Sequence, residues 1–490
     1  MKCLWWLLLS LFSGSTLFAQ LQLGLRTENY AGVNALAINP AHAVYSALDW
    51  DVNLIGAGVF FETNYAYLNE SSLLRELNRL DVSQFTLSNR MEEGTPLSEL
   101  ANTTVVMYKD TRRQYRYQNL QTLMGPGFMV RVNEQLAVGV RSAAKVWSSG
   151  TNIPTELNYQ RYDKRPFGAD FGVDDIQFSL MSWIETGVSL AYRVPTYSGS
   201  FGFGLAAKFM RGYESGFLRN RSPFLMSKQP DMSFVIESVD ADFGYTTSNI
   251  DASQEGFDLT ANGAGFGFDA GITYAVEDRE GTPTLRLSAA LNDIGGIRFN
   301  RNAVYHRLRN DMPALQRYDD YRDLSGLEDL PELVDRFIAS ATSRDEPGFA
   351  VETNAFRVGL PSTFNLQADV RVHELFHVNA LLVQNLRNDG ISVRQPSVLA
   401  VVPRFEHRWG SVAVPLSLYD YDRSRVGLAL RAAYLAVGTD DLGAWFFPGQ
   451  LNSADIYVAL KLNSFRLGSG DGLPTHRRKR GGKRQQCYKF

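Results

Sequence analysis

Cysteine is almost absent from this chain: its 490 residues include only Cys3 and Cys487. Cys3 lies in an N-terminal segment that we expect to be removed, which leaves the mature chain one thiol and no internal disulfide. Long apolar runs are missing after that segment, since none approaches the roughly 20 residues of a membrane-spanning helix, and the mean hydropathy is −0.19. The composition therefore excludes a disulfide-stabilised scaffold and a helical membrane protein.

Catalytic motifs are equally scarce. There is no phosphate-binding loop with Lys-Ser/Thr, no nucleophile elbow and no paired-cysteine metal site, and the six histidines form no recognisable triad. The run His373-Glu374-Leu375-Phe376-His377 matches the H-E-x-x-H that zinc proteases place on one face of a helix. Here it joins two alternating apolar runs, which predicts a hairpin turn, and Ala380 and Val383 stand where an extended metal motif has glycine and histidine.

A second string resembles a nucleotide-binding motif. Gly265-Phe266-Gly267-Phe268-Asp269-Ala270 fits a loose G-x-G-x-x-A pattern, which normally opens a helix. The apolar alternation instead continues to Val276, so we expect a strand. Its inward glycines would leave space in a crowded lumen or allow a plug to approach the backbone. We therefore expect that the protein is not an enzyme and that it has no cofactor, no catalytic residue and no metal site.

The chain does contain many segments in which apolar residues alternate with polar or small ones. Between Phe266 and Val276 every second residue is apolar, and the same period recurs at 201–209 and 426–434. Such a strand has one apolar face and one polar face. Strand candidates continue to Asp455–Leu462 and include Thr103–Tyr108, Met232–Glu237 and Gly443–Phe447. The pattern predicts an all-β fold, a single antiparallel transmembrane β-barrel of about 14 strands over residues 51–465.

The N-terminus carries an export signal. Lys2 precedes an apolar stretch from Leu4 to Phe12, and small residues follow up to Ala19, which is typical of a bacterial secretory signal over residues 1–19. Residues 20–50 read as a periplasmic or hatch segment, with Asn39, Pro40 and Ala41 as hatch candidates. The predicted location is the bacterial outer membrane.

Two long insertions interrupt the strands. Leu68–Asn102 and Arg298–Phe356 each contain leucines at helical spacing, which predicts short helices within large loops. Barrels of this kind place short turns on the periplasmic side and long loops outside, so both should be extracellular or folded into the mouth.

The C-terminal end, residues 466–490, is predicted to be a disordered basic tail. From Gly472 to Phe490 there are seven Lys or Arg residues and no acidic one, so residues 1–471 carry a formal charge of −10. Such a tail is normally solvated. The alternative is a periplasmic arm that touches anionic lipid, cell-wall polymer or an envelope protein; nucleic acid is not an expected partner of an exported chain.

Charged residues occupy the polar face of the predicted strands. Pairing across strands would fill the interior of the barrel, and the alternative is a polar path that selects a solute. The predicted lumen-facing residues are Lys208, Asp269, Arg286, Asp369, Arg371, Arg404, Glu406, Arg408, Arg431 and Lys461. Tyr192, Tyr434, Trp409 and Trp445 fall near predicted strand ends, where aromatic rings favour the headgroup level.

Several runs resemble an uncharacterised outer-membrane family of Bacteroidetes. They are Asn29–Gly32 with Asn39–Ala41, Leu360–Asn365, Pro403–Glu406 with Val414–Ser417, and Gly427–Arg431 with Gly438–Asp441 and Asp455–Tyr457. The Asn-Pro-Ala element is also similar to the N-terminal hatch of FadL-like barrels, which carry long-chain fatty acids and other hydrophobic compounds. The resemblance implies an outer-membrane barrel without an established activity.

Two functions fit this interpretation. The first is passage of a small or hydrophobic solute across the outer membrane. The second is a non-transporting barrel that anchors or assists secretion or envelope assembly through its loops or its basic tail. In both, the expected surroundings are outer-membrane lipid.

Overall fold

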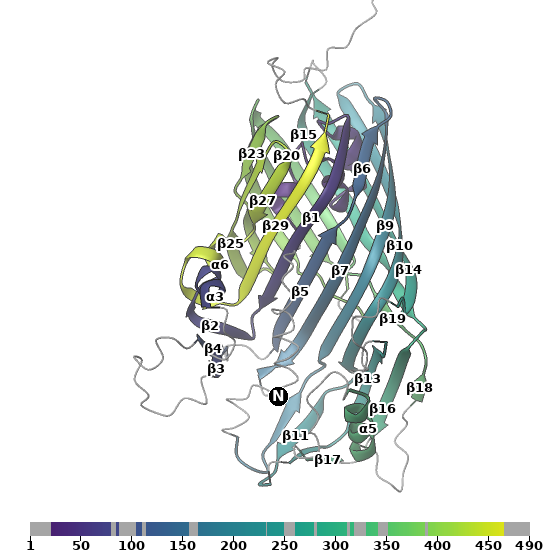
Figure 1. The fold of residues 1–490 in the computed structure, drawn as a ribbon, viewed down its shortest axis with the longest axis vertical. Coiled ribbons are helices and arrows are strands. Elements are labelled where there is room, and N and C mark those ends of the chain that lie inside the picture. The colour runs from purple at the N-terminus through teal and green to yellow at the C-terminus, as the bar shows by residue number, and fades with distance from the viewer. Residues whose placement is uncertain are drawn as a thin grey trace, which may run out of the picture.

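The computed structural model describes residues 21–79, 85–87, 104–109, 114–155, 165–231, 233–248, 260–278, 282–310, 314–317, 330–341, 351–387 and 391–464. The predicted signal at 1–19 and the predicted basic tail at 466–490 lie outside these residues, as do both cysteines. The described part folds into a closed, antiparallel, 14-stranded β-barrel, as the alternation predicts (Figure 1).

The barrel closes where its first and last strands pair. β1 (Trp50–Thr63) pairs with β29 (Ser453–Asn463), for example at Val59 and Ile456. Several barrel strands are interrupted, so the main sheet contains more segments than the barrel has strands. The remaining segments are β5 (Gln114–Met124), β6 (Gly127–Arg131), β7 (Leu136–Pro154), β9 (Gln177–Pro195), β10 (Gly199–Asn220), β13 (Val239–Thr246), β14 (Gly263–Glu277), β15 (Pro283–Phe299), β16 (Ala303–Asn310), β18 (Val351–Thr353), β19 (Phe356–Gly359), β20 (Thr363–His373), β21 (Phe376–Asn385), β22 (Val398–His407), β23 (Gly410–Ala413), β24 (Leu416–Tyr419), β25 (Arg423–Val426), β26 (Leu428–Ala432) and β27 (Leu435–Thr439).

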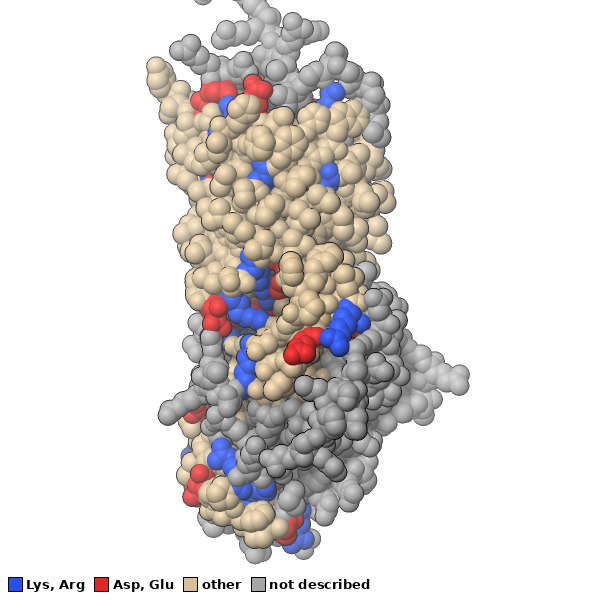
Figure 2. All heavy atoms as spheres, turned by 90° about the vertical axis from the view of Figure 1, so that its left-hand side faces the viewer, with Lys and Arg blue, Asp and Glu red and all other residues tan. Residues whose placement is uncertain are grey.

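The outer wall of the barrel is apolar. Along β10, Phe203, Leu205 and Phe209 are exposed, whereas the intervening Gly204 and Lys208 are buried. Leu205 pairs with Ala270 of β14 and Leu190 of β9, so neighbouring strands present the same face. Figure 2 shows a broad band with few charged side chains on the half of the wall that lies away from the long loops. The two-residue period therefore sorts side chains between wall and lumen.

The two ends of the barrel differ in their connections. Two-residue turns such as Glu374-Leu375 and Ala433-Tyr434 lie at one end, together with the start of β1 and the end of β29. The opposite end carries the long loops, with two small four-stranded sheets. Those sheets contain β8 (Asp170–Val173), β11 (Phe224–Lys228), β12 (Phe234–Ile236) and β17 (Ala314–Gln316), and β2 (Ala66–Ser71), β3 (Phe85–Leu87), β4 (Thr104–Tyr108) and β28 (Gly449–Leu451).

Short helices stand in the loops, as predicted for both insertions. α3 (Leu73–Arg79) lies in the first insertion and α5 (Leu330–Ala341) in the second, and both are at the long-loop end (Figure 1). Within the described residues, no helix has the length and apolarity needed to cross a membrane.

One predicted strand was wrong, and two others lie outside the barrel. Gly443–Phe447 is helical: α6 (Leu442–Phe446) begins after Asp441, whose carboxylate accepts a hydrogen bond from the backbone N–H of Ala444 at 3.2 Å. Thr103–Tyr108 and Met232–Glu237 contain strands β4 and β12, but both belong to the loop sheets rather than the barrel. Trp445 accordingly lies on α6, whereas Tyr192 is exposed on the barrel wall and Trp409 and Tyr434 lie in short turns.

Candidate functional site

Residues 21–48, which we call the plug, lie inside the barrel. The plug contains α2 (Leu23–Arg26) and two 3-10 helices, η1 (Gly32–Ala37) and η2 (Pro40–Tyr45), and nearly all of its residues are buried. It contacts separate parts of the wall, since Gly24 N–H donates to the Tyr457 hydroxyl of β29 at 3.2 Å and the Tyr45 hydroxyl donates to the Ser200 carbonyl of β10 at 3.0 Å. The lumen is therefore occupied by the chain's own N-terminal segment.

Glycines in the wall make room for the plug. A Cβ atom added to Gly204 would lie 2.2 Å from the backbone nitrogen of Ala41, and one added to Gly271 would lie 2.0 Å from the side-chain oxygen of Asn39. Real Cβ atoms do not approach other atoms so closely. These inward glycines of β10 and β14 thus serve close packing, as their position in the alternation predicts.

The hatch candidates hold the turn between η1 and η2. The Asn39 side chain accepts from Ala41 N–H at 2.8 Å and donates to the carbonyls of Ile272 and Ala289 at 3.3 Å. Pro40 is the first residue of η2, where a missing N–H costs nothing. Asn39 therefore fastens both the local fold of the plug and its contact with β14 and β15.

Arg431 and Lys461 are among the charged wall residues that bind the plug directly. Arg431 forms an ion pair with Glu28 at 3.0 Å. Lys461 forms an ion pair with Asp51 at 3.2 Å and donates to the carbonyls of Tyr30 and Ala31 at 3.0 and 2.7 Å. Both cations are buried, so the partners supplied by the plug replace the water that each has lost.

A second ionic cluster links three strands to the plug at Asn29. Asp369 is paired with Arg286 and, at 2.7 Å, with Arg404, which is also paired with Glu406. The Asn29 amide donates to Glu406 at 2.8 Å. All four charged residues are at most 8% exposed.

A third cluster contains Lys208, which is paired with Asp269 at 2.7 Å and with Asp293 at 2.6 Å. The last two predicted lumen residues lie at the short-turn end. Arg371 is paired with Asp278, and Arg408 lies in the turn after β22, where its carbonyl accepts from Arg431. The predicted residues thus divide into plug contacts, wall pairs and turn positions.

Burial perturbs several titratable groups of the plug, His42 and Arg26 among them. Desolvation lowers the pKa of His42 to about 3, and the nearby Arg286 acts in the same direction. His42 lies 3.2 Å from the Ser288 hydroxyl. Desolvation, followed by repulsion from Arg141, lowers the pKa of Arg26 to about 10.

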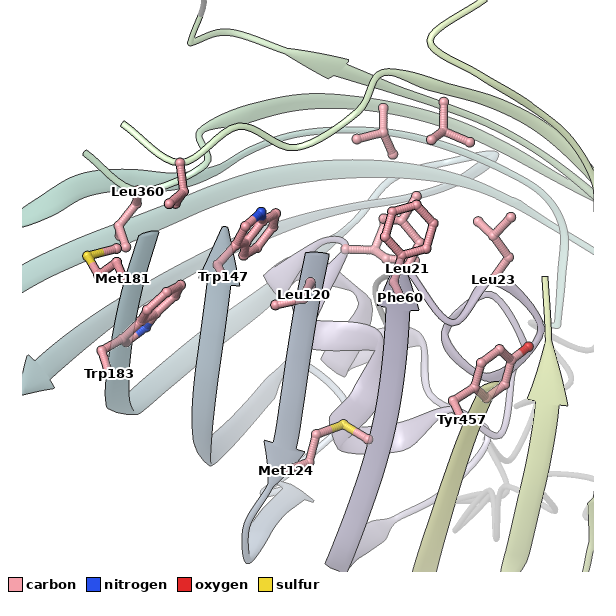
Figure 3. Close-up of a cluster of buried hydrophobic side chains, with 14 of the residues drawn as sticks. Leu21, Leu23, Phe60, Leu120, Met124, Trp147, Met181, Trp183, Leu360 and Tyr457 are labelled. Carbon is pink, nitrogen blue, oxygen red and sulfur yellow. The ribbon is translucent and has the colours of Figure 1, made fainter. Parts of the chain in front are cut away.

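The lumen also contains a large apolar cluster that the sequence analysis missed. Phe60, Leu120, Trp147 and Trp183 point inward from neighbouring strands, and Leu21 and Leu23 of the plug join them (Figure 3). The two indoles are stacked, with ring centroids 6.4 Å apart. These apolar side chains occupy the inward positions of their strands, which elsewhere in the barrel carry polar residues. An aromatic residue at an inward position was therefore the signal by which the cluster could have been predicted.

A loop closes over this cluster. Residues 391–397 connect β21 to β22, and the Arg394 carbonyl accepts from the Trp147 indole N–H at 3.1 Å. Arg394 is also paired with Asp420 at 2.6 Å, and Val393 N–H donates to the Gly359 carbonyl. This loop, which we call the strap, joins three parts of the wall across the lumen.

A cavity of about 80 Å³ lies between the plug and the wall. Leu21, Arg26 and Ile38 line it from the plug, and Gln395 lines it from the strap. Strands β5 and β7 supply apolar lining and charge, including Leu120, Met124, Arg141, Lys145 and Trp147.

The two motif strings fall on barrel strands. His373 ends β20 and Phe376 begins β21, with His377 paired opposite Arg371, so the H-E-x-x-H string forms the predicted hairpin rather than a helix. The glycine string 265–270 lies within β14, where no helix begins. Among the described residues, His, Cys, Asp and Glu form no group of three able to hold a metal ion.

Comparison with known proteins gives a family and several distant structures. The model of a family of unknown function, DUF5723, matches residues 40–440. The Pseudomonas putida toluene transporter TodX is 10% identical, with 89% of this chain and 95% of that chain covered and a TM-score of 0.39. The Ralstonia pickettii toluene transporter TbuX is 9% identical (92% and 96% covered, TM-score 0.32), and a Pseudomonas aeruginosa FadL homologue is 9% identical (88% and 92% covered, TM-score 0.23). No curated protein matches the sequence.

Proposed function

Since the chain belongs to the DUF5723 family, whose description assigns no activity, we propose from the geometry that it passes a small hydrophobic solute across the bacterial outer membrane. The apolar outer band would contact lipid, and the plug would control the lumen. The proposal includes no enzymatic step. The attribution to Bacteroidetes remains a prediction from sequence.

The observation that carries the proposal is the apolar cluster inside the lumen. A water-filled pore is lined by polar side chains, whereas Phe60, Leu120, Trp147 and Trp183 offer a solute apolar contacts in the barrel interior. The cluster meets the plug at Leu21 and Leu23, so a movement of the plug would change what the cluster contacts.

The polar contacts of the plug support its movement as a unit. They are hydrogen bonds and ion pairs at separate points of the wall, such as Glu28 with Arg431 and Asn39 with β14 and β15. Each typical hydrogen bond contributes only about 1 kcal/mol net, whereas removal of one partner of a buried ion pair costs about 3–5 kcal/mol, so the ion pairs hold the plug more firmly than the hydrogen bonds do. The alternative, a barrel that anchors an assembly through its loops, does not account for an apolar lumen.

The experiment locks the plug to the wall. A Cβ atom added to Gly127 would lie 3.6 Å from the Cγ2 atom of Val33, which places a cysteine at each position within reach of the other, and it would lie 3.0 Å from the Val140 carbonyl oxygen, so β6 must shift by a few tenths of an ångström to accept the pair Val33→Cys and Gly127→Cys. Both changes are made in a Cys487→Ser background, and the protein is placed in vesicles whose outer leaflet is lipopolysaccharide, because toluene crosses a phospholipid bilayer unaided. We expect oxidation to slow uptake of toluene at least tenfold and reduction to restore it.

The reduced double variant is the matched control, since it has the same sequence. Equal uptake by the oxidised, reduced and unsubstituted proteins would contradict control by the plug. Uptake no faster than that of protein-free vesicles in any form would contradict the transport function itself.

A further inference from the structure

The cavity between the plug and the wall contains hydrogen-bond donors that have no acceptor. Arg26 of the plug and Arg141 of β7 both line it, as does Asn34 of η1. The Nε atoms of both arginines and the side-chain nitrogen of Asn34 are shielded from solvent, and none has a hydrogen-bond partner among the described residues. Buried donors of this kind are rarely left unsatisfied, and an unmet donor of a charged group is the most costly.

The other charges near the cavity are already paired. Lys145 is 2.9 Å from Glu185, and Lys208 is held by Asp269 and Asp293. Arg141 reaches only one of these carboxylates, Asp269, at 3.6 Å.

Arg26 forms no ion pair within the described part of the chain. Asp440, Asp293 and Glu185 attract its guanidinium from a distance. The Asp440 carboxylate is occupied by Leu23 N–H and the Tyr457 hydroxyl. Arg26 and the weakly paired Arg141 are thus the cations that lack a close partner.

The size and lining of the cavity limit what can fill it. A water molecule needs about 10–15 Å³ of such space, so about 80 Å³ accommodates roughly five to eight heavy atoms, which fits propionate and sets benzoate at the upper limit of size. The wall beside the arginines is apolar at Leu120, Met124 and Trp147. A compact molecule with one anionic end and a small apolar body satisfies the arginines and this apolar wall. The side-chain oxygens of Asn53, Asn292 and Asn365, which also line the cavity and have no hydrogen-bond donor among the described residues, are left to water.

We propose that this cavity binds a small organic carboxylate, whose oxygens accept hydrogen bonds from the guanidinium groups of Arg26 and Arg141. A carboxylate matches the planar donor pattern of arginine. The apolar body of the ligand lies against Leu120, Met124 and Trp147. This site does not depend on transport, because it requires only the plugged state.

Calorimetric titration of the full protein in detergent tests the site. Benzoate and propionate are compared with benzamide and propionamide, which have nearly the same shape without the charge. We expect one acid to bind per chain and the amides to bind at least tenfold more weakly. Dodecanoate and inorganic phosphate are titrated in parallel, because dodecanoate presents the same carboxylate as the head of a long amphiphile.

Variants locate the binding. Arg26→Gln and Arg141→Gln should each weaken benzoate binding at least tenfold, and Arg26→Lys should retain part of it. Arg371→Gln, which alters an ion pair outside the cavity, should leave the affinity unchanged. If Arg26→Gln does not fold, the Arg141→Gln variant and the comparison of acids with amides still test the proposed site.

Four results would overturn the proposal. They are equal binding of acid and amide, benzoate binding that is unaffected by both glutamine variants, phosphate binding as tight as benzoate binding, and binding of dodecanoate without benzoate or propionate.

Discussion

The close approach of the plug to β10 makes a strong prediction about Gly204. In Gly204→Ala, the new methyl group would lie 2.2 Å from Ala41 N and 2.6 Å from Ala41 Cα. The obstacle is backbone rather than the flexible end of a side chain, so the plug itself must shift. Overpacking of this kind costs about 1–3 kcal/mol, which at about 1.4 kcal/mol per factor of ten corresponds to roughly a 5- to 150-fold change in the docking equilibrium.

Hydrogen exchange of the plug measures this change. Backbone amides of η2, residues 40–45, should exchange faster in the variant by about that factor, while amides of the barrel strands keep their protection. Gly216→Ala is the matched control, because it is on the same strand and its new methyl group would have only one neighbour within 4 Å, the Gly244 oxygen at 3.9 Å. Equal exchange of η2 in both variants would refute the packing argument.

Three further predictions concern the contacts of the plug. Lys461→Met leaves Asp51 buried without its cation and should lower the free energy of unfolding by about 3–5 kcal/mol in urea titrations; addition of Asp51→Asn should recover part of the loss, and no recovery would contradict the pairing. Burial lowers the pKa of His42 to about 3 from 6.5, so plug docking is strongest above pH 6.5 and weakens as pH falls toward 3, by about 2 kcal/mol at pH 5; hydrogen exchange across this range should show the slope, and a His42→Gln variant with the same slope would argue against it. Trp147→Phe removes the indole donor to the Arg394 carbonyl and should raise exchange at 391–397 about 5-fold; unchanged exchange there would mean that the bond does not hold the strap.

The barrel could be predicted where its two faces differ most. Between Phe201 and Phe209 the outward residues are mostly large and apolar and the inward residues are small or charged, so this part of β10 has two distinct faces. The prediction weakens toward the long-loop end, where the lumen is also apolar. β9 was predicted to begin at Trp183 but begins at Gln177, because Leu180, Met181 and Trp183 form an apolar run on both faces.

β5 was not predicted from the sequence, because polar residues occupy part of its outward face. Its outward positions include Asn119 and Gln121, so the strand has no clear apolar face. Strand pairing by backbone hydrogen bonds does not need such a face, and a neighbour on each side is enough to hold β5 in the wall.

The position of the plug could be predicted from the sequence, but its contacts with the wall could not. Asn39-Pro40-Ala41 predicts a hatch, and the inward glycines predict that something approaches the wall. The pairing of Glu28 with Arg431, or of Asn29 with Glu406, joins residues more than 370 positions apart. Which inward charge meets which plug residue depends on the register of the closed barrel, which no local pattern contains.

Spin labels along β10 test the central claim most directly. Cysteines introduced one at a time at residues 203 and 205 to 208, in a Cys487→Ser background, are labelled in protein reconstituted into lipid bilayers. We expect oxygen, which concentrates in lipid, to relax labels at 203, 205 and 207 strongly and those at 206 and 208 weakly. Uniform relaxation along the strand, or stronger relaxation by a water-soluble nickel complex at 203, 205 and 207, would contradict a lipid-facing barrel.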